Sequence, residues 1–174
     1  PGTLYEFTGG YVQTETLDPG KGDWIRSAGA GEITISSSAP LSKTKTFQPP
    51  EHMNTLTLNN TTLYFCNNIE VENPLSYSLP PKPPIGAKDI RFSGDTKLCT
   101  TDDCVIEVMK NGNTFTFEFD IKDGKDWEII DGSGNVKKCS GVQVLEFRSE
   151  TERLTLRKSA STLPKSFALH SAYP

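Results

Sequence analysis

Hydrophobic and polar residues alternate along short stretches of this chain at a period of two, the pattern of a half-buried β-strand. The clearest stretch is 114–121, where Phe115, Phe117, Phe119 and Ile121 share one face while threonines and acids share the other. The four apolar side chains are therefore predicted to face a core.

Further strands are predicted on both sides of that stretch. They cover residues 3–7, 11–14, 24–26, 32–35, 56–58, 63–65, 89–92, 104–109, 126–130, 142–147 and 153–157. Turn residues such as Asn59-Asn60 divide them. The abundance of Gly, Pro, Ser, Thr and Asn also favours short strands over long helices. This spacing predicts an all-β fold built around an antiparallel β-sandwich, Ig-like or jelly-roll-like.

The segment Leu79-Pro80-Pro81-Lys82-Pro83-Pro84 interrupts the strands. It lacks a backbone N–H at four positions, because proline has none. A central strand is therefore excluded, and an extended, polyproline-like connection is predicted.

Composition shifts suggest the domain organisation. A length of 174 residues allows one to two domains. Residues 39–50 are rich in Ser, Lys, Thr and Pro, and are predicted to be a linker. We therefore expect 1–38 to be the C-terminal part of a first β domain and 51–158 to be the sandwich. Residues 159–174 lose the alternation and are expected to be a linker toward a further domain.

Charge and hydropathy exclude two classes of partner. The formal net charge is -4, with no basic stripe that could neutralise phosphates, so a nucleic acid is not expected. No apolar run approaches the roughly 20 residues that span a bilayer, so no membrane span is expected.

The four cysteines, an even number, suit two disulfides in an oxidising compartment. Cys99 and Cys104 flank a short polar loop that is easily closed. This favours a Cys99–Cys104 bridge, which leaves Cys66 and Cys139 as a long-range pair, although the other pairings stay open. A zinc site is disfavoured because two of the cysteines stand alone in sequence.

Catalytic chemistry finds little support. His52 and His170 are the only histidines that could serve as a neutral-pH base, and both fall in expected loop or tail segments. No Gly-x-Ser-x-Gly or His-Glu-x-x-His motif is present. A carboxylate pair such as Glu107 and Glu118 is better explained as a solvated strand face. The chain is predicted not to be an enzyme.

Four aspartates, Asp120, Asp123, Asp126 and Asp131, cluster near glycines and offer oxygen ligands for Ca²⁺. Their spacing does not match an EF-hand loop. Acids with glycine between strands are typical of ordinary hairpin turns, so turns are favoured and calcium is the alternative. No other cofactor is predicted.

Trp24 and Trp127 are candidates for a sugar-stacking platform. Tryptophans in sandwiches more often close a core edge, and the expected linker separates these two. We therefore expect both side chains to be mostly buried and to lie in different domains.

Three segments share a resemblance. Residues 11–26, with Leu17-Asp18-Pro19-Gly20-Lys21-Gly22-Asp23-Trp24, resemble a segment of secreted surface proteins of the Bacteroidota and Chlorobi group, in which an aromatic usually stands at Asp23. Residues 79–92 resemble a second segment of the same proteins, in which Lys88 is commonly an aromatic. Residues 163–174 are similar to the lead-in to a C-terminal sorting domain of type IX secretion substrates.

The resemblance implies a non-catalytic structural or adhesive module of an exported protein, secreted or on the outer cell surface. Its expected partners are neighbouring domains of the same polypeptide, surface glycans or other copies of itself. The alternative is a carbohydrate-binding module of a secreted enzyme.

Overall fold

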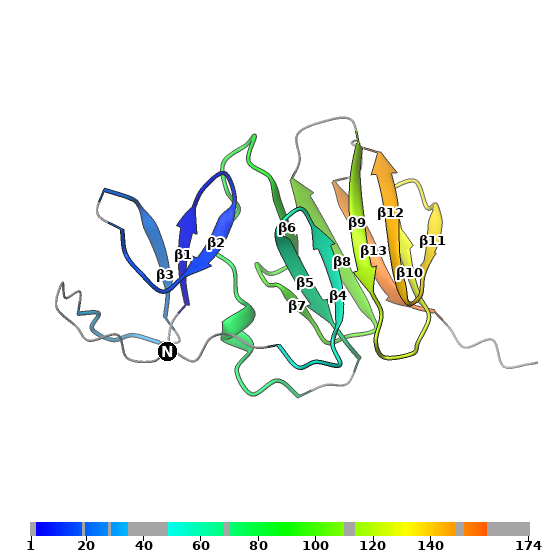
Figure 1. Cartoon of the computed structure of the whole chain (residues 1–174), viewed down its shortest axis with the longest axis horizontal. Helices are drawn as coiled ribbons and strands as arrows, with labels where there is room; N and C mark the ends of the chain where they lie inside the picture. The colour runs from blue at the N-terminus through cyan, green and yellow to red at the C-terminus, as the bar shows by residue number, and fades with distance from the viewer. Residues whose placement is uncertain are drawn as a thin grey trace, which may run out of the picture.

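The computed structural model describes residues 3–18, 20–27, 29–34, 49–67, 70–109, 114–148 and 152–159. These residues form an all-β fold of thirteen strands and one short 3-10 helix, arranged in three sheets (Figure 1). The predicted fold class, all-β with a β-sandwich, is confirmed. Within this part of the chain, no helix has the length and apolar character needed to cross a bilayer.

The N-terminal sheet contains three antiparallel strands in the order β2-β1-β3. They are β1 (Thr3–Phe7), β2 (Tyr11–Thr14) and β3 (Asp23–Arg26). Gly9 adopts φ 86 in the turn between β1 and β2, a conformation that glycine reaches without strain. The predicted strand at 32–35 is wrong for Glu32 to Thr34, which are not in a strand, and Ile35 lies outside the described residues.

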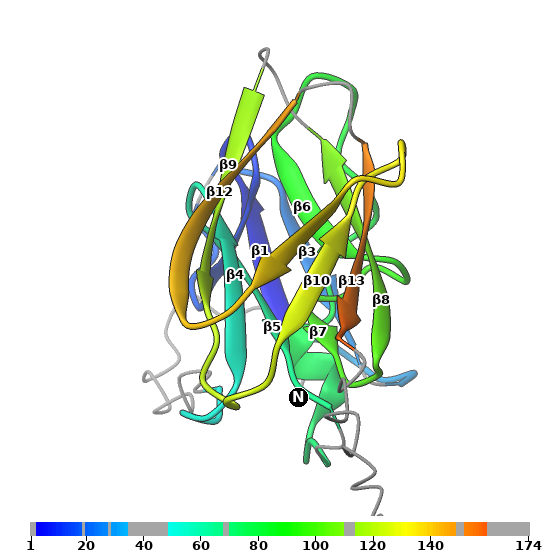
Figure 2. The same ribbon diagram turned by 90° about the vertical axis from the view of Figure 1, so that its right-hand side faces the viewer.

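The sandwich contains two five-stranded sheets, ordered β11-β10-β13-β8-β6 and β12-β9-β4-β5-β7. Figure 2 shows them as two layers, with β9, β12 and β4 in one and β10, β13 and β8 in the other. All pairs are antiparallel except β5 with β7. The strands are β4 (Asn54–Leu58), β5 (Thr61–Phe65), β6 (Asp89–Phe92), β7 (Leu98–Cys99), β8 (Asp103–Met109), β9 (Thr114–Asp120), β10 (Trp127–Ile130), β11 (Val136–Cys139), β12 (Val142–Arg148) and β13 (Arg153–Lys158).

The core lies between the two layers and is rich in aromatic side chains. On β9, Phe115, Phe117 and Phe119 are buried, as is Ile121 just beyond it, so the predicted inward face is confirmed. The Phe117 ring contacts those of Phe115, Phe119 and Phe147 at centroid distances of 5.1, 6.1 and 5.3 Å. Burial of each such side chain stabilises the fold by about 1.5–3 kcal/mol.

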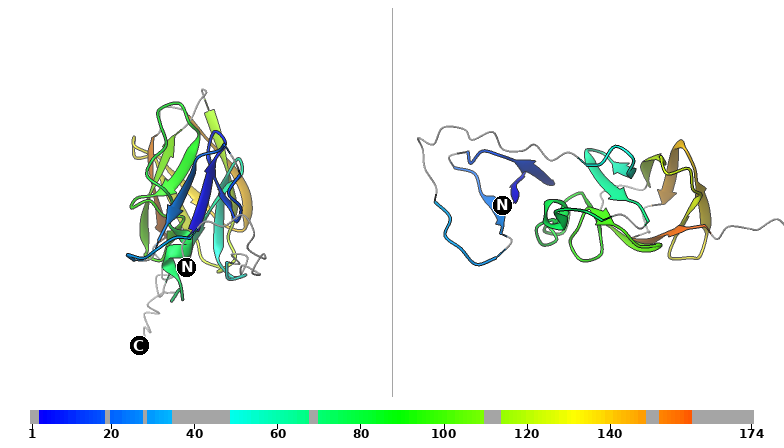
Figure 3. Two further views of the ribbon diagram at one scale, coloured as in Figure 1. Left: turned by 90° about the vertical axis from the view of Figure 1, so that its left-hand side faces the viewer. Right: turned by 90° about the horizontal axis from the view of Figure 1, so that it is seen from below.

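A helical turn and an extended segment connect β5 with β6. The 3-10 helix η1 (Pro74–Tyr77) is followed by residues 79–84, which form no strand, as their prolines predict. Figure 3 shows η1 between the N-terminal sheet and the sandwich, with the N-terminal sheet at one end of the molecule. The connection therefore leads from β5 in one layer of the sandwich to β6 in the other.

One disulfide joins Cys99 on β7 to Cys104 on β8, with their Cα atoms 6.2 Å apart. Since β7 and β8 belong to different sheets, the bridge ties the two layers together. The predicted Cys66–Cys139 pair does not form, and both cysteines are free and buried. Cys139 packs in the main core, whereas Cys66 packs in a separate small cluster with Met53 and Tyr77, which keeps the two thiols apart.

The other predicted boundaries fall largely outside the description. Residues 35–48, which include most of the predicted linker 39–50, lie outside the described residues, as does the tail from 160 to 174. The predicted division at 1–38 and 51–158 remains a prediction.

Candidate functional site

The two tryptophans differ in exposure. Trp127 on β10 is fully buried, and its Nε1 donates a hydrogen bond to Asp123 Oδ2 at 3.2 Å. Trp24 on β3 is 49% exposed, so the prediction that both are mostly buried is wrong for Trp24. The reason is that β3 is an edge strand of a small sheet, with no second sheet layered over it.

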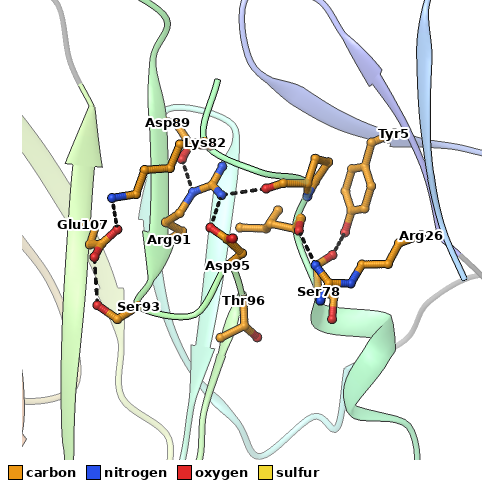
Figure 4. A network of polar contacts seen from close by, with 12 residues as sticks. Tyr5, Arg26, Ser78, Lys82, Asp89, Arg91, Ser93, Asp95, Thr96 and Glu107 are labelled. Atoms are coloured by element: carbon orange, nitrogen blue, oxygen red, sulfur yellow. Dashed lines mark hydrogen bonds and ion pairs between the residues drawn. The ribbon is translucent and has the colours of Figure 1, made fainter. Parts of the chain in front are cut away.

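The N-terminal sheet contacts the connection through two buried or partly buried hydrogen bonds. The Tyr5 hydroxyl donates to the Ser78 carbonyl at 2.6 Å. Two strands of the sheet take part, because Arg26 Nη1 on β3 donates to the Leu79 carbonyl at 3.0 Å. Figure 4 shows both side chains reaching from the sheet to the same short piece of backbone.

The sandwich binds the same piece of backbone on either side of those contacts. The Lys97 amide donates to the Tyr77 carbonyl at 2.7 Å, and Arg91 Nη1 donates to the Pro80 carbonyl at 2.7 Å. Four successive carbonyls, at residues 77 to 80, therefore accept hydrogen bonds from two different parts of the fold. We call residues 77–80 the carbonyl strip.

Arg91 is held in a buried ion cluster beside the strip (Figure 4). Its side chain is 1% exposed and lies 2.6 Å from carboxylate oxygens of both Asp89 and Asp95. Burial alone would lower the pKa of Arg91, but hydrogen bonds and charges from Asp89 and Asp95 raise it above the ordinary value. The guanidinium therefore stays charged, so it can pair with both carboxylates at once.

Tyr5 is fully buried at the junction. Burial raises the pKa of Tyr5 to about 12, with a smaller opposing effect from the charge of Arg26. Lys97 Nζ lies 5.4 Å from the centre of the Tyr5 ring, within range of a cation–π interaction. Because the phenol stays protonated at neutral pH, it remains a donor to the Ser78 carbonyl.

A small cavity of about 260 Å³ opens at the same junction. Trp24 and Ile25 from β3 and Pro80 and Pro81 from the connection give it apolar walls, and Arg26 supplies a charge. Tyr5 and Ser27 complete the lining. We call this cavity the Trp24 cleft.

A larger cavity of about 580 Å³ lies under residues 82–87, on the outer face of β6 and β8. Its central acid, Glu107, pairs with Lys82 at 2.6 Å and with Arg153 at 3.6 Å. The hydrogen bond from Lys82 lowers the pKa of Glu107, with burial opposing it. The lining cations Lys82, Arg91 and Arg153 each pair with a carboxylate of the protein, so none of them is left for an anionic ligand.

The four aspartates proposed for calcium do not converge. Asp123 caps a turn by accepting from the Lys125 amide, and Asp131 accepts from the amides of Ser133 and Asn135. Asp120 pairs with Lys122 at 3.4 Å, and Asp126 is exposed, with its backbone carbonyl accepting from the Ser159 amide. In the described ranges, no group of three or more His, Cys, Asp or Glu residues could hold a metal ion. Turn formation accounts for Asp123 and Asp131.

The residues considered for catalysis are also separated. His52 is exposed in the turn before β4, and His170 lies outside the described residues. Glu107 and Glu118 lie on β8 and β9, which belong to different sheets, and each alternates with buried residues that face the core. The two carboxylates therefore point away from opposite faces of the sandwich, which excludes them as a catalytic pair.

Comparisons with known proteins add no relative: no protein-family model, no curated protein and no solved structure matches the chain. What the fold itself defines is a β-sandwich protein with an additional three-stranded sheet docked at one end. The candidate sites that this fold presents are the carbonyl strip and the Trp24 cleft.

Sequence reasoning missed the ion cluster of Asp89, Arg91 and Asp95. The alternation in 89–92 predicted a half-buried strand with Asp89 and Arg91 on the solvent side. Both are buried because the preceding connection folds over that side. The signal in the sequence was a pair of opposite charges two residues apart, Asp89 and Arg91, shortly after the proline-rich segment 79–84.

Proposed function

We propose that this chain is a non-catalytic structural spacer module of an exported cell-surface protein, which holds neighbouring domains of one polypeptide at a fixed distance and orientation. The observation that carries the proposal is the carbonyl strip. It accepts from Tyr5 and Arg26 on one side and from Lys97 and Arg91 on the other. A spacer needs a junction that resists bending, and hydrogen bonds from both sides supply that resistance.

Two further features support the proposal. The Cys99–Cys104 disulfide suits an oxidising compartment outside the cytoplasm. The resemblance of residues 11–26 and 79–92 to secreted surface proteins points the same way. These two segments contain Arg26 and the last residues of the carbonyl strip, so the resemblance falls partly on the junction itself.

The stiffness of the junction can be measured with spin labels on cysteines introduced at Gln13 and Glu118, both exposed. The native Cys66 and Cys139 are buried, and burial raises the pKa of each thiol, so they should react slowly. We expect one narrow distance distribution, broadened by the double change Tyr5→Phe and Arg26→Gln. The matched control is Arg157→Gln, which removes an exposed ion pair with Glu128 on the sandwich. A broad distribution before any change would refute the spacer function.

Carbohydrate binding is a second candidate, favoured by one observation. Trp24 is 49% exposed beside a cavity, as sugar stacking requires. Because Trp127 is fully buried, acrylamide quenching of fluorescence reports mainly on Trp24. A saccharide that occupies the cleft should reduce the quenching, and Trp24→Ala should abolish the effect. Quenching that no saccharide changes would remove this candidate.

A further inference from the structure

We infer that the Trp24 cleft selects acidic saccharides, sugars that carry a carboxylate, over neutral ones. The inference rests on the second candidate function, carbohydrate binding at this cleft, and names its ligand class. It depends on the charge of Arg26, which the pattern of the sequence did not single out.

Strand geometry puts an aromatic ring and a cation side by side. Trp24 and Arg26 are two residues apart on β3 and therefore share a face. Their Cα atoms are about 6.6 Å apart at the usual rise of a strand, roughly the width of one sugar ring. Pairing with β1 places Tyr5 opposite Trp24 and Thr3 opposite Arg26, so this face is turned toward the carbonyl strip.

Within the described ranges, the charge of Arg26 is not paired with an acid. Its Nη1 donates to a neutral acceptor, the Leu79 carbonyl, and in the described ranges no carboxylate forms an ion pair with it. Among the described residues, no Asp or Glu lines the cleft. A guanidinium has five N–H donors in a planar fork that matches a carboxylate, so Arg26 retains donors for a ligand.

In the larger cavity, by contrast with the Trp24 cleft, the cations are paired with acids of the protein. There Lys82 and Arg153 both face Glu107, and Arg91 faces Asp89. Its cations are neutralised by the protein itself. Arg26 in the Trp24 cleft has no such carboxylate partner in the described part of the chain, so a bound ligand can supply one.

The walls of the cleft determine the rest of the ligand. A small inorganic anion would use Arg26 but would gain nothing from Trp24, Ile25 or Pro81. A sugar ring presents an apolar face to an aromatic platform and hydroxyls to its surroundings. The volume of about 260 Å³ suits one ring rather than a long chain. One sugar unit that carries a carboxylate would both stack on the apolar wall and pair with Arg26.

The test compares glucuronate with glucose, which differ in the carboxylate, by fluorescence titration and calorimetry on the whole chain. We expect glucuronate to bind about tenfold more tightly, a factor typical of one added charged contact. The advantage should shrink as salt is added, because the contact is partly exposed. Trp24→Ala should weaken both ligands.

Two variants test the charge itself. Arg26→Gln should remove the preference for glucuronate, and a cooperative melt within a few degrees of the native midpoint would report that the fold survives. Ser27→Glu leaves Arg26 and its bond to Leu79 in place but adds an acid at the exposed rim, and should also weaken glucuronate. Val144→Glu, which adds the same charge on distant β12, should not.

The outcomes separate this inference from the function on which it rests. Equal binding of glucose and glucuronate would overturn the acidic preference and leave carbohydrate binding standing. Binding of neither would overturn both. Binding of acetate or benzoate as tight as that of glucuronate would overturn the saccharide and leave only an anion site.

Discussion

At the scale of single residues, Arg91 connects the ion cluster to the junction. It is the only residue found, among those described, that joins two carboxylates and the carbonyl strip at once. Its pair with Asp89 is buried, whereas Asp95 is partly exposed. Removing one partner of a buried pair leaves uncompensated charge in a poorly solvated place.

Arg91→Ala should lower the free energy of unfolding by about 3–5 kcal/mol, the usual cost of breaking a buried ion pair. Urea denaturation followed by circular dichroism measures it. The matched control is Arg157→Ala, which breaks an exposed pair with Glu128 and should cost less than about 1 kcal/mol. Equal effects of the two changes would show that the ion cluster does not stabilise the junction.

Tyr5 makes a pH-dependent contribution to stability. Its pKa is raised from the ordinary value of 10.0 to about 12 in the folded chain. Between these values the unfolded chain has released the proton and the folded chain keeps it, so stability is lost as pH rises. The difference in unfolding free energy between the native chain and Tyr5→Phe should fall by about 1.4 kcal/mol per pH unit in that window. A flat difference would show that Tyr5 ionises freely when folded.

At the scale of elements, β9 organises the sandwich. It pairs with both β12 and β4, and its inward residues form much of the aromatic core. The strand was the clearest in the sequence because its alternation is uninterrupted over seven residues.

Phe117→Asp should unfold the sandwich, because Phe117 is 0% exposed and a carboxylate there would be buried without a partner. Glu118→Gln, on the exposed face of the same strand, should leave the melting temperature nearly unchanged. Thermal melting with near-ultraviolet circular dichroism checks both. Cooperative melting of the Phe117→Asp chain would mean that the inward face has been misassigned.

Thiol labelling tests the state of the four cysteines, which lie on β7, β8 and β11 and directly after β5. Labelling of the unreduced, denatured chain should find two reactive thiols, since Cys66 and Cys139 are free and Cys99 is bonded to Cys104. Reduction should then yield four reactive thiols. It should also lower the unfolding free energy of the chain by about 2 kcal/mol, the value expected for a disulfide that closes so short a loop. Four reactive thiols before reduction would contradict the Cys99–Cys104 disulfide. No reactive thiol before reduction would show that Cys66 and Cys139 are also bonded.

At the scale of the whole molecule, the sandwich has a core of its own. The residues of its main cluster come from strands β4 to β13, and none comes from the N-terminal sheet. The N-terminal sheet adds the buried Tyr5 and its contacts with the carbonyl strip. The two parts are therefore joined at an interface rather than through a shared core.

A fragment of residues 49–159 should fold without the N-terminal sheet and melt cooperatively, because its core is complete. Its melting temperature should lie a few degrees below that of the chain of residues 1–159, as expected for a loss of about 1–2 kcal/mol of junction contacts. Scanning calorimetry measures both. An unfolded fragment would show that the sheet is part of the sandwich rather than a docked neighbour.

Most strands were predicted from the sequence because alternation and turn residues act locally. The inward face of β9, the lack of a strand at residues 79–84 and the short-loop disulfide each depend on a few neighbouring residues. The two short strands β7 and β11 were missed. They hold two and four residues, too few for alternation to stand out, and both are edge strands of their sheets.

Local patterns in the sequence predicted most of the strands and, for β9, which side of the strand is buried. The tertiary structure decided what covers each side. Asp89 and Arg91 are buried because the connection at 79–84 lies over them, whereas Trp24 is exposed because β3 is the edge strand of a small sheet. The Tyr5–Ser78 contact spans 73 residues. A period of two says that a strand has two faces, but which distant segment packs on each face depends on how the whole chain folds.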